Sequence, residues 1–165
     1  MSQMSFEQFA AIDAIKQIKY AYLRHVDLKQ WPELAALLTE DCVGTYSDGK
    51  HSYAGRDAIM GFLEKSLGTP DVITVHVVHH PEIQLSADGK TASGVWYLED
   101  RVINRSDADA AKHYEISGAA FYADEYRLTD DGWKISATGY KRVYEQTVVG
   151  DKILRFKNRH AGHFN

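Results

Sequence analysis

The chain has 165 residues, of which 44% are hydrophobic and 25% are charged, and its formal net charge is −4. This length and balance indicate one folded domain with a core and room for a pocket, and they argue against disorder. Charges of both signs are interspersed and no apolar run approaches the roughly 20 residues that span a bilayer, so we expect neither nucleic-acid binding nor a membrane span.

The first part of the chain has the periodicity of helices. A capping box and apolar residues at helical spacing predict a long amphipathic helix over residues 5–26. Pro32 suits the first turn of a second, short helix that continues through Leu38. A third helix is predicted from Ala58 and is stopped by Gly68.

The other predicted elements are strands. A short strand over residues 42–46 leads into an Asp-Gly turn. Later in the chain the hydrophobic period changes from roughly 3.6 residues to roughly 2. Four longer strands are predicted there, at residues 72–85, 91–105, 114–128 and 133–145. Their short Asp-Gly connections favour an antiparallel, strongly bent meander.

Helices followed by a long antiparallel sheet define the α+β class. We predict a curved antiparallel sheet wrapped around the N-terminal helices, forming a cone with one internal, mostly apolar pocket. The domain should cover residues 1–147. Residues 148–165 should form a tail that either caps the pocket of its own or a neighbouring subunit, or is disordered. The single cysteine and the lack of a basic and then apolar leader at residues 1–9 predict a cytoplasmic protein.

Two residues break the apolar pattern of the predicted sheet. His76 lies in a β-branched stretch, residues 74–83, where its neighbours should line the core. On the next strand, Asp100 belongs to the same row as Trp96 and Leu98, because residues two apart share a face. A carboxylate facing inward is unfavourable unless it is paired, so both residues are candidates for chemistry.

Further candidates lie on the other strands and on the first helix. Tyr122 and Tyr126 share one face of the third long strand, and Tyr140 and Arg142 share one face of the fourth. Rings with polar tips suit a pocket for a flat, hydroxylated ligand, and they equally suit an interface.

Tyr22 and Asp27 stand near the end of the first helix. Five residues turn a helix by about 140°, so these two can converge only if the helix ends near Val26.

Each candidate also has a purely structural interpretation. His76 can be a core histidine bonded to a carbonyl, and Asp27 can cap the second helix. Asp100 and Arg142 can form a structural ion pair, and Tyr22 can be a core residue. A metal site built from the clustered histidines is not expected, because alternation along a strand points His79 away from its neighbours. The sequence contains no phosphate loop or dinucleotide fingerprint, so we expect no nucleotide cofactor.

Several segments together resemble a known family. They are Tyr22–Asp27, Gly55–Ile59, Thr74–His76, Trp96–Asp100, Tyr122–Tyr126 and Asp131–Ile135. With them the chain resembles the SnoaL-like branch of the nuclear transport factor two-like, or cystatin-like cone, superfamily. The similarity extends over nearly all of residues 5–145. It implies a cone fold, which agrees with the fold that the order of predicted helices and strands indicates.

The resemblance also implies an activity, although this superfamily contains isomerases, dehydratases, dehydrochlorinases, cyclases and non-enzymatic binders. The most similar motifs are those of the bile acid 7α-dehydratases, hexachlorocyclohexane dehydrochlorinase and, more distantly, scytalone dehydratase. These enzymes eliminate a small leaving group without a metal or an organic cofactor. By their pattern, the catalytic residues would be His76, Asp27, Tyr22, Asp100 and Arg142.

We therefore expect a lyase without metal or cofactor, which acts through a His76–Asp27 dyad on a hydroxylated steroid-like or aromatic molecule. The residues expected to bind this substrate are Trp96, Leu98, Tyr122, Tyr126 and Tyr140. A ketosteroid-isomerase-like proton-transfer enzyme and a non-catalytic binder of a hydrophobic ligand are the alternatives. Family members are commonly trimers or dimers, so a homo-oligomer is implied. Neither its subunit number nor the substrate follows from the sequence.

Overall fold

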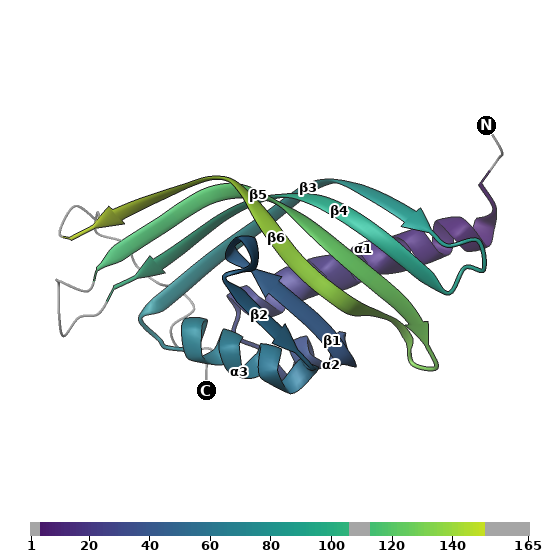
Figure 1. The fold of residues 1–165 in the computed structure, drawn as a ribbon, viewed down its shortest axis with the longest axis horizontal. Coiled ribbons are helices and arrows are strands. Elements are labelled where there is room, and N and C mark those ends of the chain that lie inside the picture. Colours follow the sequence, from purple (N-terminus) through teal and green to yellow (C-terminus); the bar gives the residue numbers. More distant parts are fainter. Residues whose placement is uncertain (1–3, 106–112, 151–165) are drawn as a thin grey trace.

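A six-stranded sheet bends around the long N-terminal helix in this computed structural model (Figure 1). The structure describes residues 4–105 and 113–150. The helices are α1 (Phe6–Asp27), α2 (Trp31–Ala36) and α3 (Arg56–Leu67), with a 3₁₀ turn, η1 (Ser47–Gly49). The strands are β1 (Leu38–Tyr46), β2 (His51–Ala54), β3 (Val72–Leu85), β4 (Thr91–Asn104), β5 (Tyr114–Thr129) and β6 (Gly132–Val149).

The three predicted helices and the four long strands are present, but β1 begins at Leu38, four residues before the predicted strand, and β2 was not predicted. The capping box at the start of α1 is complete, because Gln8 N–H donates to Ser5 Oγ and Ser5 N–H donates to Gln8 Oε1. The predicted tail begins inside β6, which continues to Val149, and its remainder from residue 151 lies outside the described residues. No helix in the described part of the chain combines the length and the apolarity needed to cross a membrane.

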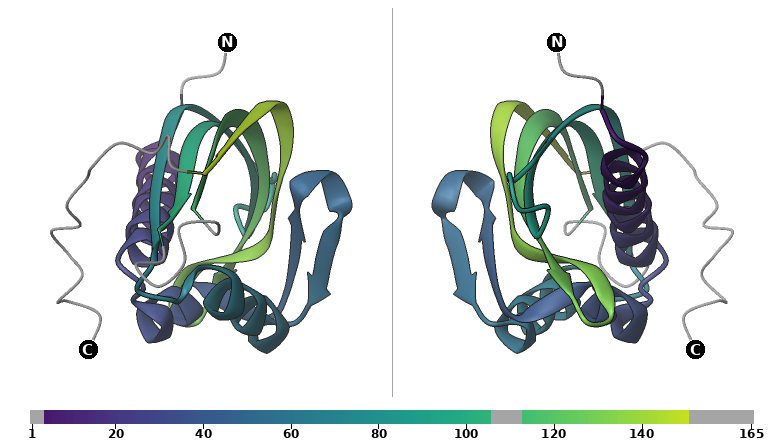
Figure 2. Two further views of the ribbon diagram at one scale, coloured as in Figure 1. Left: turned by 90° about the vertical axis from the view of Figure 1, so that its left-hand side faces the viewer. Right: turned by 90° about the vertical axis from the view of Figure 1, so that its right-hand side faces the viewer.

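The strand order is β2-β1-β6-β5-β4-β3, and β3 to β6 form the predicted antiparallel meander. The β1–β6 pair is parallel, so the prediction of a wholly antiparallel sheet is wrong at this junction. No hairpin turn joins β1 to β6, and the distant segments of the chain that meet there are therefore free to run in the same direction. Figure 2 shows α1 on one side of the curled sheet, with α2 and α3 at its base.

A buried ion pair attaches α1 to the sheet. Lys19 Nζ lies 2.7 Å from Asp124 Oδ2 on β5, and neither side chain is exposed to solvent. The contact is an ion pair without hydrogen-bond geometry, and the ammonium also lies 3.3 Å from the centroid of the Tyr122 ring. Asp124 also accepts hydrogen bonds from Tyr126 Oη–H at 3.0 Å and from Thr138 Oγ1–H at 2.7 Å. One carboxylate therefore connects α1, β5 and β6. Burial lowers the pKa of Lys19, an effect that Asp124 opposes.

The ion pair gives a test of how the core is held. Replacing Lys19→Met should destabilise the protein by about 3–5 kcal/mol, because Asp124 would keep a buried charge without its cation. The double variant Lys19→Met/Asp124→Asn should unfold at a higher urea concentration than Lys19→Met, although it carries one change more. Arg127→Met, which breaks the exposed pair with Asp41, is the control and should cost no more than about 1 kcal/mol. Equal stability of the single and double variants would contradict this account.

Close packing of β5 against β6 depends on Gly118. A Cβ at this position would overlap with the carbonyl oxygen of Tyr144 and come within 3.1 Å of Arg142 Nη1. An irregularity in the pairing lies directly beside it, since Ala119 pairs with Tyr144 whereas Ala120 pairs with Arg142. Together, the glycine and this bulge let the Arg142 side chain lie across β5.

Two glycine substitutions should therefore have opposite effects. Gly118→Ala should lower the free energy of unfolding by about 1–3 kcal/mol, because the new methyl group meets backbone atoms that have no room to move. Gly61→Ala in α3 should raise it by about 0.5–1 kcal/mol, since nothing lies within 4 Å of the added carbon. Chemical denaturation of both variants measures the difference, and a neutral Gly118→Ala would contradict the packing argument.

Candidate active site

A cavity of about 300 Å³ opens between α1, α3 and the inner face of the sheet. Helices α1 and α3, the turn η1 and the six strands contribute to its lining. Six of the predicted site residues border it, namely Tyr22, His76, Asp100, Tyr122, Tyr140 and Arg142. Alternation places the five strand residues on the inward face of β3 to β6, and Tyr22 comes from α1. Tyr46, Phe62, Tyr114 and Glu145 also line the cavity.

His76 and Asp27 form a close pair. His76 Nδ1 lies 2.6 Å from Asp27 Oδ1, and the backbone N–H of His76 donates to Asp27 Oδ2 at 2.9 Å. With both oxygens of Asp27 engaged, the carboxylate favours the tautomer that carries hydrogen on Nδ1 and leaves Nε2 as the basic nitrogen. The side chains are 11% and 23% exposed, so the pair is sheltered without being sealed.

Asp27 contacts His76 from outside the cavity. It is the last residue of α1 and does not line the cavity, whereas Tyr22, five residues earlier, does. Asp27 and His76 instead border a second groove between α1 and β3. The helix turn therefore separates Tyr22 from Asp27, and the two residues that line both hollows are Leu23 and His76. The alternative role of Asp27 as a cap is not seen, because Gln30 occupies the N-cap of α2.

Lys29 stands next to this pair on the corner after α1. Its Nζ donates to Thr74 Oγ1 at 2.9 Å, two residues before His76 on β3. Burial lowers the pKa of Lys29 to about 8, although the charge of Asp27 opposes this shift. The corner of the helix is thus fixed to β3 by one hydrogen bond as well as by the dyad.

The lowered pKa of Lys29 has a measurable effect on stability. Between about pH 8 and about pH 10.5 the unfolded chain binds more protons at this lysine than the native chain does, so stability rises with pH. Relative to Lys29→Met, the native protein should gain up to about 2 kcal/mol across this range, a limit set by partial solvent screening. Urea unfolding of both proteins at several pH values tests this, and a constant difference would contradict it.

Asp100 and Arg142 meet at the other side of His76. Asp100 is the direct cross-strand neighbour of His76, and it receives two hydrogen bonds from Arg142, Nη1 to Oδ1 and Nη2 to Oδ2, the latter at 2.9 Å. Arg142 Nε lies 3.2 Å from Glu145 Oε2. Burial by itself would lower the pKa of Arg142, but the bonds to Asp100 outweigh it and raise the pKa. The ion pair foreseen as a structural alternative is present, and it lies within the cavity wall.

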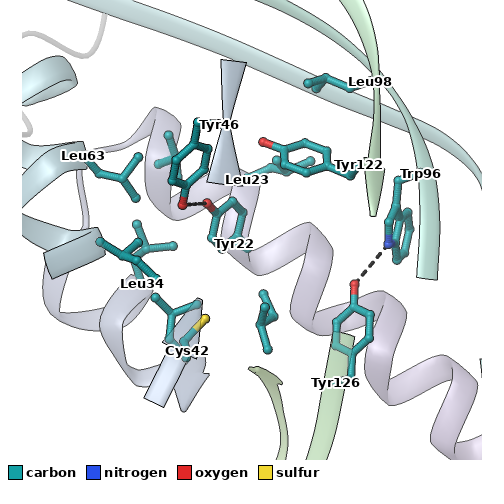
Figure 3. Packing of buried hydrophobic residues seen from close by; sticks show 14 of the residues in the cluster. Tyr22, Leu23, Leu34, Cys42, Tyr46, Leu63, Trp96, Leu98, Tyr122 and Tyr126 are labelled. Atoms are coloured by element: carbon teal, nitrogen blue, oxygen red, sulfur yellow. Dashed lines mark hydrogen bonds between the residues drawn. The ribbon is translucent and has the colours of Figure 1, made fainter. Parts of the chain in front are cut away.

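Five tyrosines line the cavity, namely Tyr22, Tyr46, Tyr114, Tyr122 and Tyr140. Tyr22 Oη and Tyr46 Oη are 3.4 Å apart (Figure 3), and Tyr122 packs edge-on against Tyr140 with ring centroids 5.6 Å apart. Burial raises the pKa of Tyr22, Tyr46 and Tyr122 above that of a free phenol. These groups stay protonated near neutral pH and can donate hydrogen bonds to a bound oxygen.

Three predicted binding residues lie deeper. Trp96, Leu98 and Tyr126 are fully buried in the core and are not among the residues that line the cavity. The Trp96 indole N–H donates to Tyr126 Oη at 3.0 Å (Figure 3), and Tyr126 in turn donates to Asp124. The polar side-chain atoms of Trp96 and Tyr126 are therefore hydrogen-bonded within the core.

Some lining residues were not foreseen. Tyr114 has the same parity as Tyr122 on β5, so alternation alone could have identified it. Glu145 and Phe62 carry no such signal, because the bulge in β6 and the docking of α3 decide where they point.

The other two histidines of β3, His79 and His80, do not line the cavity. His80 has a left-handed backbone conformation, with φ of 46°, inside a break in the β3–β4 pairing, and it is exposed. No group of three or more metal-ligating side chains is found among residues 4–105 and 113–150.

Fold and cavity together define an α+β cone with a cavity between its helices and its sheet. A model of the SnoaL-like domain matches residues 7–139, and the chain therefore belongs to the SnoaL-like family. The family and the cone predicted from the sequence motifs are both confirmed.

Solved structures show the same fold. A candidate scytalone dehydratase from Novosphingobium aromaticivorans DSM 12444 is 22% identical with a TM-score of 0.74, and the match covers 93% of this chain and 100% of that chain. A type 2 hexachlorocyclohexane dehydrochlorinase (LinA) is 21% identical with a TM-score of 0.74, over 93% and 97% of the two chains. The type 3 dehydrochlorinase from Novosphingobium barchaimii LL02 is 19% identical with a TM-score of 0.73, over 90% and 97%. At these identities the likeness establishes the fold.

Proposed function

We propose that the protein is a lyase that eliminates water or another small leaving group from a hydroxylated aromatic or steroid-like molecule, with His76 as its base. The observation that carries the proposal is the 2.6 Å contact between His76 Nδ1 and Asp27 Oδ1 at the wall of an apolar cavity. The names of the similar structures, a candidate dehydratase and dehydrochlorinases, support the same reaction class.

The reaction would begin at Nε2 of His76. This nitrogen removes a proton from a carbon of the substrate, and Asp27 stabilises the imidazolium that results. The electron pair of the broken C–H bond forms the new double bond as the neighbouring C–O bond breaks. The imidazolium returns its proton to the departing hydroxide, so that one water molecule leaves and His76 is again neutral.

Tyr22 would support the oxygen on which charge develops. Burial raises the pKa of this phenol, so it acts as a hydrogen-bond donor that keeps its proton. Asp100 receives two bonds from Arg142, an arrangement that suits an ionised carboxylate better than a proton donor. We therefore assign Asp100 and Arg142 to holding a polar end of the substrate beside His76. Tyr122 and Tyr140 would form the aromatic wall around it.

The dyad gives the direct test of this proposal. Hydroxylated steroids and lignin-type aromatics are screened by product mass, since elimination removes the leaving group from the mass and isomerisation leaves the mass unchanged. On a substrate that is turned over, His76→Ala and Asp27→Asn should each lower kcat/KM by about 10²- to 10⁴-fold, the usual contribution of a general base. Arg127→Met, which breaks the exposed pair with Asp41 and does not alter the cavity lining, is the control and should keep full kcat/KM.

Each result of this assay has a meaning for the assignment. Full kcat/KM in both dyad variants, with normal folding by circular dichroism, would remove His76 and Asp27 from the mechanism. A product of unchanged mass would replace elimination by proton transfer within the substrate. A stoichiometric ligand that is retained unchanged during incubation would favour a binding protein.

We also propose that the protein is a homo-oligomer, a dimer or trimer formed through the outer face of the sheet. Val75, Val77, Val95 and Phe121 are each more than 40% exposed there, and Tyr97 packs against Phe121 at 5.0 Å. Phe121→Glu should shift the mass measured by light scattering toward that of one chain, because it places a charge on this apolar face. An unchanged mass would exclude this face as the contact.

A further inference from the structure

Three charged side chains meet at the polar wall of the cavity, and two of them are acidic. In the sheet pairing His76 lies opposite Asp100, Asp100 opposite Gly118, and Gly118 opposite Glu145. Arg142 reaches this row from β6 across the bare backbone of Gly118. The wall therefore consists of one cation between two carboxylates, directly beside the dyad.

The guanidinium of Arg142 is enclosed on its edges and on one face. Nη1 and Nη2 donate to the two oxygens of Asp100, and Nε lies 3.2 Å from Glu145 Oε2. The ring of Tyr140 lies 4.9 Å from the guanidinium carbon. With both terminal nitrogens committed to one carboxylate, this arginine presents no fork to a second anion.

The carboxylates, in contrast, keep unused acceptor capacity. Asp100 can accept about four hydrogen bonds, and the described residues supply the two from Arg142. The Glu145 side chain is 47% exposed, and it contacts Arg142 through one oxygen. The formal charge of these three groups is −1, since one positive group faces two negative groups. An O–H or N–H donor is favoured at such a wall and a ligand carboxylate is repelled.

We propose that this cavity selects uncharged or cationic ligands that present a hydroxyl or amine donor, that it rejects carboxylates, and that Glu145 is the residue that sets this preference. The inference deepens the proposed function and rests on it for the identity of the site, but it concerns binding and needs no turnover. The substrate class becomes a neutral alcohol or phenol whose hydroxyl group is held by acceptors beside His76.

Matched two-ring probes test the preference, because they differ in one substituent and are small enough for a cavity of about 300 Å³. Naphthalene-2-methanol, 2-methylnaphthalene and 2-naphthoate are titrated into the protein near neutral pH, and binding is followed by probe fluorescence and by calorimetry. The alcohol should bind about tenfold more tightly than the carboxylate and more tightly than the methyl compound. In Glu145→Gln the preference for the alcohol over the carboxylate should fall about threefold or more.

Two controls separate this inference from others. Glu125→Gln makes the same change of net charge at an exposed position of β5 whose residue does not line the cavity, and it should keep the full preference. Glu33→Gln, an exposed position of α2 that does not line the cavity, should keep it as well. The preference is a ratio of binding affinities measured without turnover, so a failure of the proposed elimination leaves this result intact. Equal or tighter binding of 2-naphthoate, no binding of the alcohol, or an unchanged ratio in Glu145→Gln would each overturn the assignment.

Discussion

The position of α1 against the sheet depends on one buried carboxylate. Asp124 accepts hydrogen bonds from Tyr126 and Thr138 and balances the charge of Lys19, so a single group on β5 fixes the helix and the neighbouring strand. Such a pair contributes little net stability compared with apolar packing, but it has a demanding geometry. Tyr22 and Asp27 follow Lys19 along the same helix. The ion pair therefore helps to set the position of both residues relative to the sheet.

The sheet positions the rest of the site by register. His76 and Asp100 are direct cross-strand neighbours, and the row continues through Gly118 to Glu145. Strands hold side chains more firmly than loops do, so groups from three strands and one helix end can be placed around one volume. The bulge between Arg142 and Tyr144 changes the alternation of β6, so that Arg142 and Glu145, three residues apart, both line the cavity.

Sequence periodicity was sufficient for much of this arrangement. Alternation indicated that His76 and Asp100 could share the inward face, whereas the helix period left open whether Tyr22 and Asp27 converge, because the answer depends on where α1 ends. Alternation reports the face of a residue and not its depth along the cone, so Trp96 and Tyr126 could not be distinguished from cavity residues. Lys19 could not be found in this way, because a lysine on a helix is normally exposed and only the partner across the fold explains its burial. The parallel β1–β6 pair was missed because no local turn encodes it.

The groove behind the dyad gives the proposed reaction a second contact with water. Asp27 lines this groove, whereas the cavity proposed for the substrate lacks Asp27 and shares His76 with the groove. The hydrogen on Nδ1, which Asp27 holds, can exchange with solvent along this path while the cavity is occupied. The two nitrogens of one ring would then carry hydrogens with different fates, because the hydrogen taken from the substrate by Nε2 leaves with the eliminated water and the Nδ1 hydrogen exchanges with bulk water.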